Sequence, residues 1–207
     1  MKAIMSTYVS TQSAEQTLQD MMTQYCEQYV YPDMKKLIEV LTQLSDEQKL
    51  HVLQQEYLVR KAPLHNAALR GHTEIISTLL TSLPSSANRL KLLMVDKYYT
   101  PLRLAVYFGH TESVRMILDC LTADQQIQLM PVQSSGDMTA IQYAESTGCR
   151  DTVRILREYQ QRAENLIREE YSKLIFHNIL ISPCVGLWNI NYPALLSGYA
   201  HIFPRMK

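Results

Sequence analysis

Apolar and polar positions recur with a nearly constant period through the middle of the chain. Three segments align in register, namely residues 62–76, 100–114 and 139–153. Pro63 and Pro101 lie 38 positions apart, and the corresponding position of the third segment follows 39 positions later. Because the spacing is kept while many side chains change, the pattern predicts one structural unit repeated along the chain.

Each segment has the pattern of two helices joined by a turn. Thr100 precedes Pro101, and a Thr hydroxyl can cap a helix whose first position accepts proline. A glycine ends the first helix of each unit, where a left-handed conformation is needed. An alanine on the buried face lets the neighbouring helix approach, and apolar residues at helical spacing after the glycine predict the second helix. The alanines are Ala67, Ala105 and Ala144, the glycines are Gly71, Gly109 and Gly148, and the later apolar positions include Ile76, Leu79, Leu80, Val114, Ile117, Leu118, Val153 and Leu156.

A further stretch after the second helix predicts an extra short helix in each unit. These stretches are residues 45–53, 85–93 and 122–129. Ser45 and Thr122 are each followed three residues later by Gln, which is the spacing of a capping box. All three stretches end in apolar residues at helical spacing, so we expect three helices per repeat.

Both flanks of the repeats are predicted to be helical. Residues 33–44 align with the second helices and indicate a degenerate first unit, which would cap the N-terminal end. An apolar stripe before it predicts a helix that starts near Ser13, and its members are Leu18, Met21, Met22, Tyr25 and Tyr29. After Asp151 no stop signal interrupts the pattern, so a long helix is expected to reach about Leu180.

The segment from Leu174 to Pro204 contains no Asp, Glu, Lys or Arg. It is broken by prolines and glycines, whereas a spanning helix needs about 20 mainly apolar residues. We weigh three interpretations: a folded cap on the last repeat, which is favoured, a membrane-surface or hydrophobic partner segment, and a membrane span. The expected division is therefore a solenoid over residues 1–159 and a C-terminal helix with an uncharged tail over residues 160–207.

The aligned segments resemble ankyrin repeats. The family pattern T-P-L-H-x-A followed by G-H-x-E-x-V is matched well over residues 62–76 and 100–114, and the third segment departs from it at Ala140, Gln142, Cys149 and Arg150. The resemblance covers roughly residues 31–159 and implies an all-α ankyrin-repeat solenoid, here with an extra short helix per repeat and a helical C-terminal cap. Such elongated repeats are similar to those of ankyrin effectors that intracellular bacteria deliver into host cells.

Composition removes several classes of function. Twenty basic and twenty acidic residues give a formal net charge of zero, which disfavours nucleic acid and anionic membranes as partners. The four cysteines are scattered and the N-terminus has no sustained apolar run, so a reducing, cytoplasmic compartment is expected. The resemblance adds translocation from a bacterium into a host cell. No phosphate, dinucleotide, zinc or calcium motif occurs, so we expect no cofactor and no metal.

Two groups of residues contain histidine or cysteine side chains that could act in catalysis. The resemblance implies that His65, His72 and His110 hydrogen-bond backbone groups between repeats. His177, Cys184 and His201 are residue types of a Cys/His/Asn hydrolase, and Asn178, Asn189 and Asn191 lie nearby in the sequence. No nucleophile signature surrounds Cys184. We therefore expect a protein that is not an enzyme and keep catalysis by the C-terminal third as an alternative.

The resemblance also implies a partner-binding surface on the concave side of the repeats. Its residues precede each first helix or lie just ahead of each glycine. The middle repeat contributes several aromatic residues, which often dominate interfaces, unless Tyr107 or Phe108 packs under the extra helix. The predicted function is a non-enzymatic protein–protein interaction module, an effector that binds a host protein as a monomer; the alternative is an effector whose C-terminal third acts catalytically or on a membrane. The predicted binding residues are Arg60, Leu69, Arg70, Lys97, Tyr98, Tyr99, Tyr107, Phe108, Met138 and Thr147.

Overall fold

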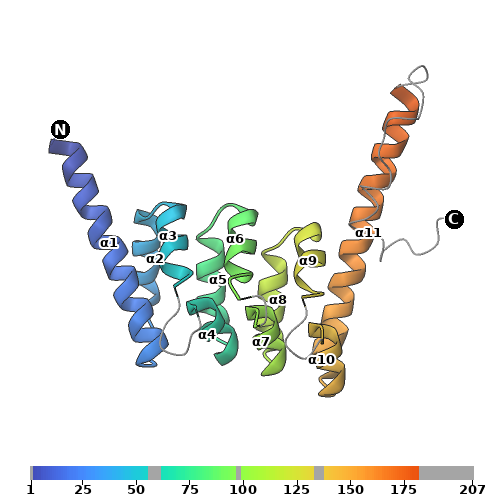
Figure 1. Cartoon of the computed structure of the whole chain (residues 1–207), viewed down its shortest axis with the longest axis horizontal. Helices are drawn as coiled ribbons and strands as arrows, with labels where there is room; N and C mark the ends of the chain where they lie inside the picture. Colours follow the sequence, from blue (N-terminus) through green and yellow to red (C-terminus); the bar gives the residue numbers. More distant parts are fainter. Residues whose placement is uncertain (1, 56–61, 97–98, 133–137, 182–207) are drawn as a thin grey trace.

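The chain folds as an all-α repeat solenoid, as predicted. A computed structural model describes residues 2–55, 62–96, 99–132 and 138–181, and all regular structure in these residues is helical (Figure 1). The helices are α1 (Lys2–Glu27), α2 (Met34–Gln43), α3 (Asp46–Leu53), α4 (Pro63–Arg70), α5 (Thr73–Thr81), α6 (Ser86–Leu93), α7 (Pro101–Tyr107), α8 (Thr111–Asp119), α9 (Ala123–Leu129), α10 (Ala140–Ser146) and α11 (Arg150–Ile181).

The helices are arranged as units stacked along one axis. Helices α4, α5 and α6 form one unit, α7, α8 and α9 form the next, and α10 with α11 forms the last. The first helices of these units pack in a row, α4 against α7 and α7 against α10, while α5 packs against α8. Figure 1 shows this row along its lower edge, with α1 and α11 at the two ends. Upstream, α1, α2 and α3 cover the first full unit.

The first helices begin where the sequence pattern places them. Pro63 and Pro101 occupy the first turn of α4 and α7, where a missing N–H group costs nothing. The hydroxyl oxygen of Thr100 accepts a hydrogen bond from the backbone N–H of Arg103 at 3.3 Å. Ala62 precedes α4 without a capping side chain, so proline alone marks the start of that helix.

The first helices also end as predicted, at three left-handed glycines with φ of 70°, 71° and 72°. In each unit the residue after the glycine donates its backbone N–H to a carbonyl five residues earlier, which closes the helix. The bonds run from His72 to Ala67 at 2.9 Å, from His110 to Ala105 at 2.8 Å and from Cys149 to Ala144 at 3.0 Å. The same turn is therefore built three times.

The extra helix predicted in each repeat is present as α3, α6 and α9. Ser45 and Thr122 form the two predicted capping boxes with the glutamines three residues later. Thr139 forms a third such box with Gln142 at the start of α10.

A long donor side chain on each inserted helix caps the end of a second helix. Lys49 Nζ donates to the carbonyl of Ser82 at 2.8 Å, and Arg89 Nη1 donates to the carbonyl of Cys120 at 3.1 Å. Ser82 and Cys120 terminate α5 and α8, the second helices of the following units. Gln126 occupies the equivalent position on α9 but donates to Leu118 within its own unit at 2.8 Å. The inserts therefore join consecutive repeats as well as lengthening each one.

One hydrophobic core runs through all units, from Ala14 on α1 to Ile167 on α11. Ala67, Ala105 and Ala144, at equivalent positions of α4, α7 and α10, are completely buried. Their small side chains allow the first helices to pack closely, as the sequence pattern predicted.

The end helices are both long, and one differs from expectation. Helix α11 runs from Arg150 to Ile181, which confirms the predicted long helix and carries it uninterrupted across the expected boundary after residue 159. The predicted start of α1 near Ser13 is wrong, because the helix begins at Lys2. No glycine or proline occurs before Pro32, so nothing in the sequence stops the helix from extending toward the N-terminus. Figure 1 shows α1 and α11 extending past the repeats on the side away from α4, α7 and α10.

Candidate interaction surface

Seven of the ten residues predicted to bind a partner lie in the described part of the chain. They occur at the C-terminal ends of the first helices or directly before the next first helix. We call the exposed and half-buried residues at the ends of α4, α7 and α10, together with the adjoining residues before these helices, the first-helix surface. The described members are Leu69, Arg70, Tyr99, Tyr107, Phe108, Met138 and Thr147; Arg60, Lys97 and Tyr98 lie outside the described residues.

Tyr107 and Phe108 form the centre of this surface. Their side chains are 54% and 48% exposed, so neither is buried beneath an inserted helix. The two ring centroids are 4.9 Å apart. Tyr107 stacks on Tyr143 of the next repeat with centroids 5.0 Å apart, and Phe108 stacks on His110 at 6.3 Å. Since two half-exposed rings are held in place by neighbours, they offer a rigid apolar contact to a partner.

The other predicted residues contribute unequally. Tyr99 and Met138 are exposed, each directly before the cap of the following helix. Leu69 is half-buried, and its carbonyl accepts a hydrogen bond from His110. The Thr147 hydroxyl donates to the carbonyl of Tyr143 at 3.1 Å. Its bond is local to α10, so Thr147 has a role in closing that helix.

Arg70 belongs to a second aromatic cluster, at the boundary between α1 and α4. Its guanidinium lies 5.0 Å from the ring centroid of Tyr25 and 4.4 Å from that of Tyr29. Its Nη1 donates to the carbonyl of Tyr25 at 2.9 Å. Tyr31 meets the His72 ring edge-on with centroids 5.2 Å apart. The first-helix surface therefore continues into the residues between α1 and α2.

Tyr29 is not part of the buried stripe to which the sequence pattern assigned it. Helix α1 ends at Glu27, and Tyr29 has a φ of 63°, in the left-handed region that non-glycine residues rarely adopt. The turn brings its side chain out under Arg70, and it is 71% exposed. The other four members of the predicted stripe are buried, because they lie within α1.

Histidines connect neighbouring units near both clusters. The Nε2–H group of His110 donates to the carbonyl of Leu69 at 3.0 Å, which is the predicted backbone bond between repeats. His72 instead bonds a side chain, since its Nδ1 lies 2.9 Å from the Tyr25 hydroxyl. Burial lowers the pKa of His72, and the electrostatic influence of the neighbouring Arg70 and His110 lowers it further. Burial raises the pKa of Tyr25, so its hydroxyl stays protonated and can donate. His65 is buried in the core.

The sequence was compared with models of protein families to identify the family of this repeat solenoid. A model for ankyrin repeats, in three copies, matches residues 31–129 and 64–168. The chain belongs to the ankyrin repeat family. A search of curated proteins found no match. Ankyrin repeats are protein–protein interaction modules, so a protein partner is the appropriate expectation for an exposed aromatic surface on this solenoid.

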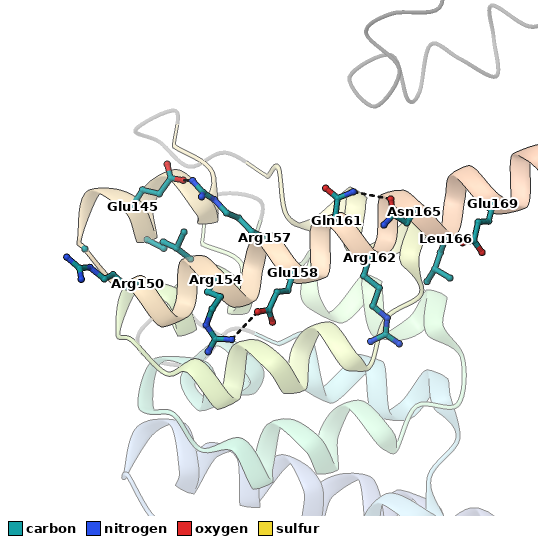
Figure 2. Close-up of a pocket in the computed structure, with 13 residues that line it drawn as sticks. Glu145, Arg150, Arg154, Arg157, Glu158, Gln161, Arg162, Asn165, Leu166 and Glu169 are labelled. Carbon is teal, nitrogen blue, oxygen red and sulfur yellow. Dashed lines mark hydrogen bonds and ion pairs between the residues drawn. The ribbon is translucent and has the colours of Figure 1, made fainter.

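A groove on the terminal ankyrin unit is the other candidate site. It has a volume of about 1100 Å³ and lies along α10 and α11 (Figure 2). Four of its charged residues form two pairs: Arg157 donates to Glu145 at 2.6 Å and Arg154 donates to Glu158 at 3.0 Å. Among the described residues that line it, Leu166 is the only large hydrophobic side chain that is exposed. These features are those of the polar end face that a solenoid needs for solubility.

The residues that the catalytic alternative needs lie largely outside the described part of the chain. Cys184 and His201 lie outside the described residues, and the side chain of His177 is not described. In the part of the chain that is described, no cluster of His, Cys, Asp or Glu is suited to hold a metal ion. No helix within residues 2–55, 62–96, 99–132 and 138–181 combines the length and apolar character needed to cross a bilayer.

The sequence pattern did not predict several residues of the first-helix surface and of the adjoining cluster around Arg70. Tyr143 lies within the third aligned segment and is not among the predicted binding residues, yet it stacks on Tyr107. Tyr29, Val30 and Tyr31 are three successive exposed apolar residues before α2. The signal that could have found them is Pro32, because a Tyr-Val-Tyr-Pro run is better suited to an extended loop than to a helix.

Proposed function

We propose that the chain is a non-enzymatic interaction module that binds its protein partner through the first-helix surface. One observation carries the proposal. Among the described residues, the exposed large hydrophobic side chains are Tyr29, Val30, Tyr31, Ile38, Tyr99, Tyr107, Phe108, Met138 and Leu166. All except Ile38 and Leu166 belong to the first-helix surface or to the adjoining cluster around Arg70. Exposed hydrophobic side chains concentrated on one surface mark interaction sites.

Affinity capture from a lysate tests the assignment of the surface. We expect the intact chain to retain specific partners that the double variant Tyr107→Ala/Phe108→Ala loses, since aromatic residues near the centre of an interface typically cost about 2 kcal/mol or more when truncated. The control is Ile38→Ala/Leu166→Ala, which removes exposed apolar side chains elsewhere. Circular dichroism verifies the fold of both. If the first variant retains the same partners as the control, the surface assignment fails.

We also propose that the partner is a host protein and that this chain acts as a monomeric bacterial effector. The support is the elongated repeat, whose extra helix resembles that of delivered ankyrin effectors. Parallel capture from host-cell and bacterial lysates distinguishes the cases, and a partner found only in the bacterial lysate would contradict the effector role. Light scattering on the purified chain checks the monomer.

The second candidate function places activity or membrane association in residues 160–207, with residues 1–159 selecting the target. It is favoured by the absence of charge from Leu174 to Pro204. A chain that ends after Glu170 keeps the first-helix surface. Under the first proposal it captures the same partners as the full chain, and under the second it binds them but loses membrane recovery or activity.

A further inference from the structure

On the row of first helices, the acidic residue forms an ion pair and the two arginines do not, among the described residues. Helices α4, α7 and α10 carry three charged residues, Arg70, Arg103 and Glu145. Glu145 accepts a hydrogen bond from Arg157 on α11 and is neutralised there. Neither Arg70 nor Arg103 has an ion pair within the described residues. In a chain of zero net charge, this surface therefore carries local positive charge beside its aromatic rings.

Arg70 is held in one position by intramolecular contacts. Its guanidinium lies against the rings of Tyr25 and Tyr29, and one of its five N–H donors is used by the Tyr25 carbonyl. The stacking limits the rotamers of a side chain that is otherwise flexible, so binding through Arg70 costs less conformational entropy.

Arg103 has an unmet hydrogen-bonding group next to the aromatic pair. Its Nη1 is buried and donates to no acceptor among the described residues. The guanidinium lies 5.9 Å from the ring centroid of Tyr143, the residue on which Tyr107 stacks. The residue as a whole is half-buried, so it is not enclosed in the core. A buried donor without an acceptor is unfavourable, and a partner acceptor that meets Nη1 after a shift of this half-buried side chain would relieve that cost.

We infer that the partner presents an acidic linear segment, in which carboxylates pair with Arg70 and Arg103 while apolar side chains pack on Tyr107 and Phe108. The inference rests on the proposed function and specifies the chemistry of the partner. Arginine recognises carboxylates through two parallel hydrogen bonds, and complementary charge selects a partner and speeds its association. The neighbouring acidic residues form no ion pair with Arg70 or Arg103: Glu74 accepts from the Tyr31 hydroxyl at 3.2 Å and Asp96 accepts from the Tyr99 N–H at 3.3 Å.

Selection of random linear peptides on the immobilised intact chain tests the inference. The enriched peptides are synthesised in two forms, one as selected and one with every Asp and Glu replaced by Asn and Gln. Fluorescence anisotropy then measures the affinity of both forms for the intact chain, for Arg70→Gln, Arg103→Gln and Tyr107→Ala/Phe108→Ala, and for the control Arg168→Gln on α11.

We expect the peptides to combine acidic with apolar residues. Replacing their acids, or substituting Arg70 or Arg103, should weaken binding about tenfold, as is typical when a hydrogen bond to a charged group is lost. Added salt should weaken the acidic form alone, and Arg168→Gln should bind both forms as the intact chain does. Because the amide form of the peptide tests the charge on an unaltered protein, the result does not depend on the folding of any variant.

Other outcomes separate the two proposals. If the amide form binds as well as the acidic form but binding is lost in Tyr107→Ala/Phe108→Ala, the interaction surface stands and the acidic preference is wrong. If that double variant binds every peptide normally, the surface assignment itself fails. If no peptide is enriched, the partner is not a linear segment and the inference is overturned.

Discussion

At the scale of single residues, a glycine can be required both by its backbone conformation and by the lack of space for a side chain. Gly71 and Gly109 both have left-handed φ values, of 70° and 71°, so both favour glycine. Only at Gly71 is the space also occupied, because a Cβ there would lie 2.5 Å from Nδ1 of His110. A Cβ at Gly109 would have no neighbour within 4 Å. The His110 ring that fills the space at Gly71 is the ring on which Phe108 stacks.

The paired variants Gly71→Ala and Gly109→Ala separate these constraints. Gly109→Ala should lower the free energy of unfolding by about 1 to 2 kcal/mol, the cost of an L-residue in the left-handed region. Gly71→Ala should lower the free energy of unfolding by roughly 1 kcal/mol more than Gly109→Ala does, because His110 must move away from the Leu69 carbonyl. Urea unfolding followed by circular dichroism measures both. Equal losses would mean that the His110 contact adds no constraint.

The structural role of a residue could be predicted from the sequence where it depends on the local backbone conformation. It could be predicted less well where it depends on contacts with distant parts of the chain. The turn glycines and the capping residues Ser45 and Thr122 were predictable, because each acts within a few residues of chain. The exposure of Tyr29 was not, because it depends on where α1 stops and on the position of Arg70 from a distant helix.

At the scale of elements, the inserted helices have a role beyond adding length. Arg89 on α6 donates to the carbonyls of Leu83, Pro84 and Cys120, and Cys120 ends the second helix of the next repeat. A cation at a helix C-terminus also interacts favourably with the helix dipole. Arg89 therefore couples two consecutive repeats.

Arg89→Met should destabilise the chain by about 2 to 3 kcal/mol, the typical range for hydrogen bonds from a charged group. Lys91→Met on the same helix is the control, since Lys91 is exposed, and should change the stability by less than about 0.5 kcal/mol. The measurement is chemical denaturation, with the slope of the transition reporting whether the repeats still unfold together. A loss in Arg89→Met no larger than in the control would contradict the coupling.

The third repeat departs from the family pattern at positions that are exposed because it is the last repeat in the described part of the chain. Gln142 occupies the position of His65 in the first repeat, and Arg150 occupies that of Thr111 in the second. His65 is 1% exposed, whereas Gln142 and Arg150 are exposed because no further repeat covers them among the residues that the structure describes. A terminal unit with a polar outer face is what a solenoid requires.

At the scale of the whole molecule, the solenoid core continues into α11. Ala163 and Ile167 are buried, and α11 packs against both α8 and α9. Ile167 is the last buried core residue in the described part of the chain. The helix beyond it extends away from the repeats (Figure 1).

Two truncated chains test how far the core extends. A chain that ends after Glu170 keeps the whole described core, so its unfolding transition should match that of the full chain if residues 171–207 add no packing to the repeats. A chain that ends after Tyr159 loses Ala163 and Ile167 and should be destabilised by about 2 to 5 kcal/mol, as for removal of a buried Ile side chain. Thermal and urea unfolding measure both. Equal stability of the two chains would place the end of the core before residue 160.

The sequence by itself determined the repeat, the start and end of most helices and the extra helix of each unit. These features follow from local physics, because capping, left-handed glycines and helical periodicity each act over a few residues. Only the tertiary structure decided which residues of different repeats meet, such as Tyr143 with Tyr107, Arg70 with Tyr29 and Arg89 with Cys120. Such contacts depend on how one unit is placed on the next, and that placement is set by packing over distances that no local pattern encodes.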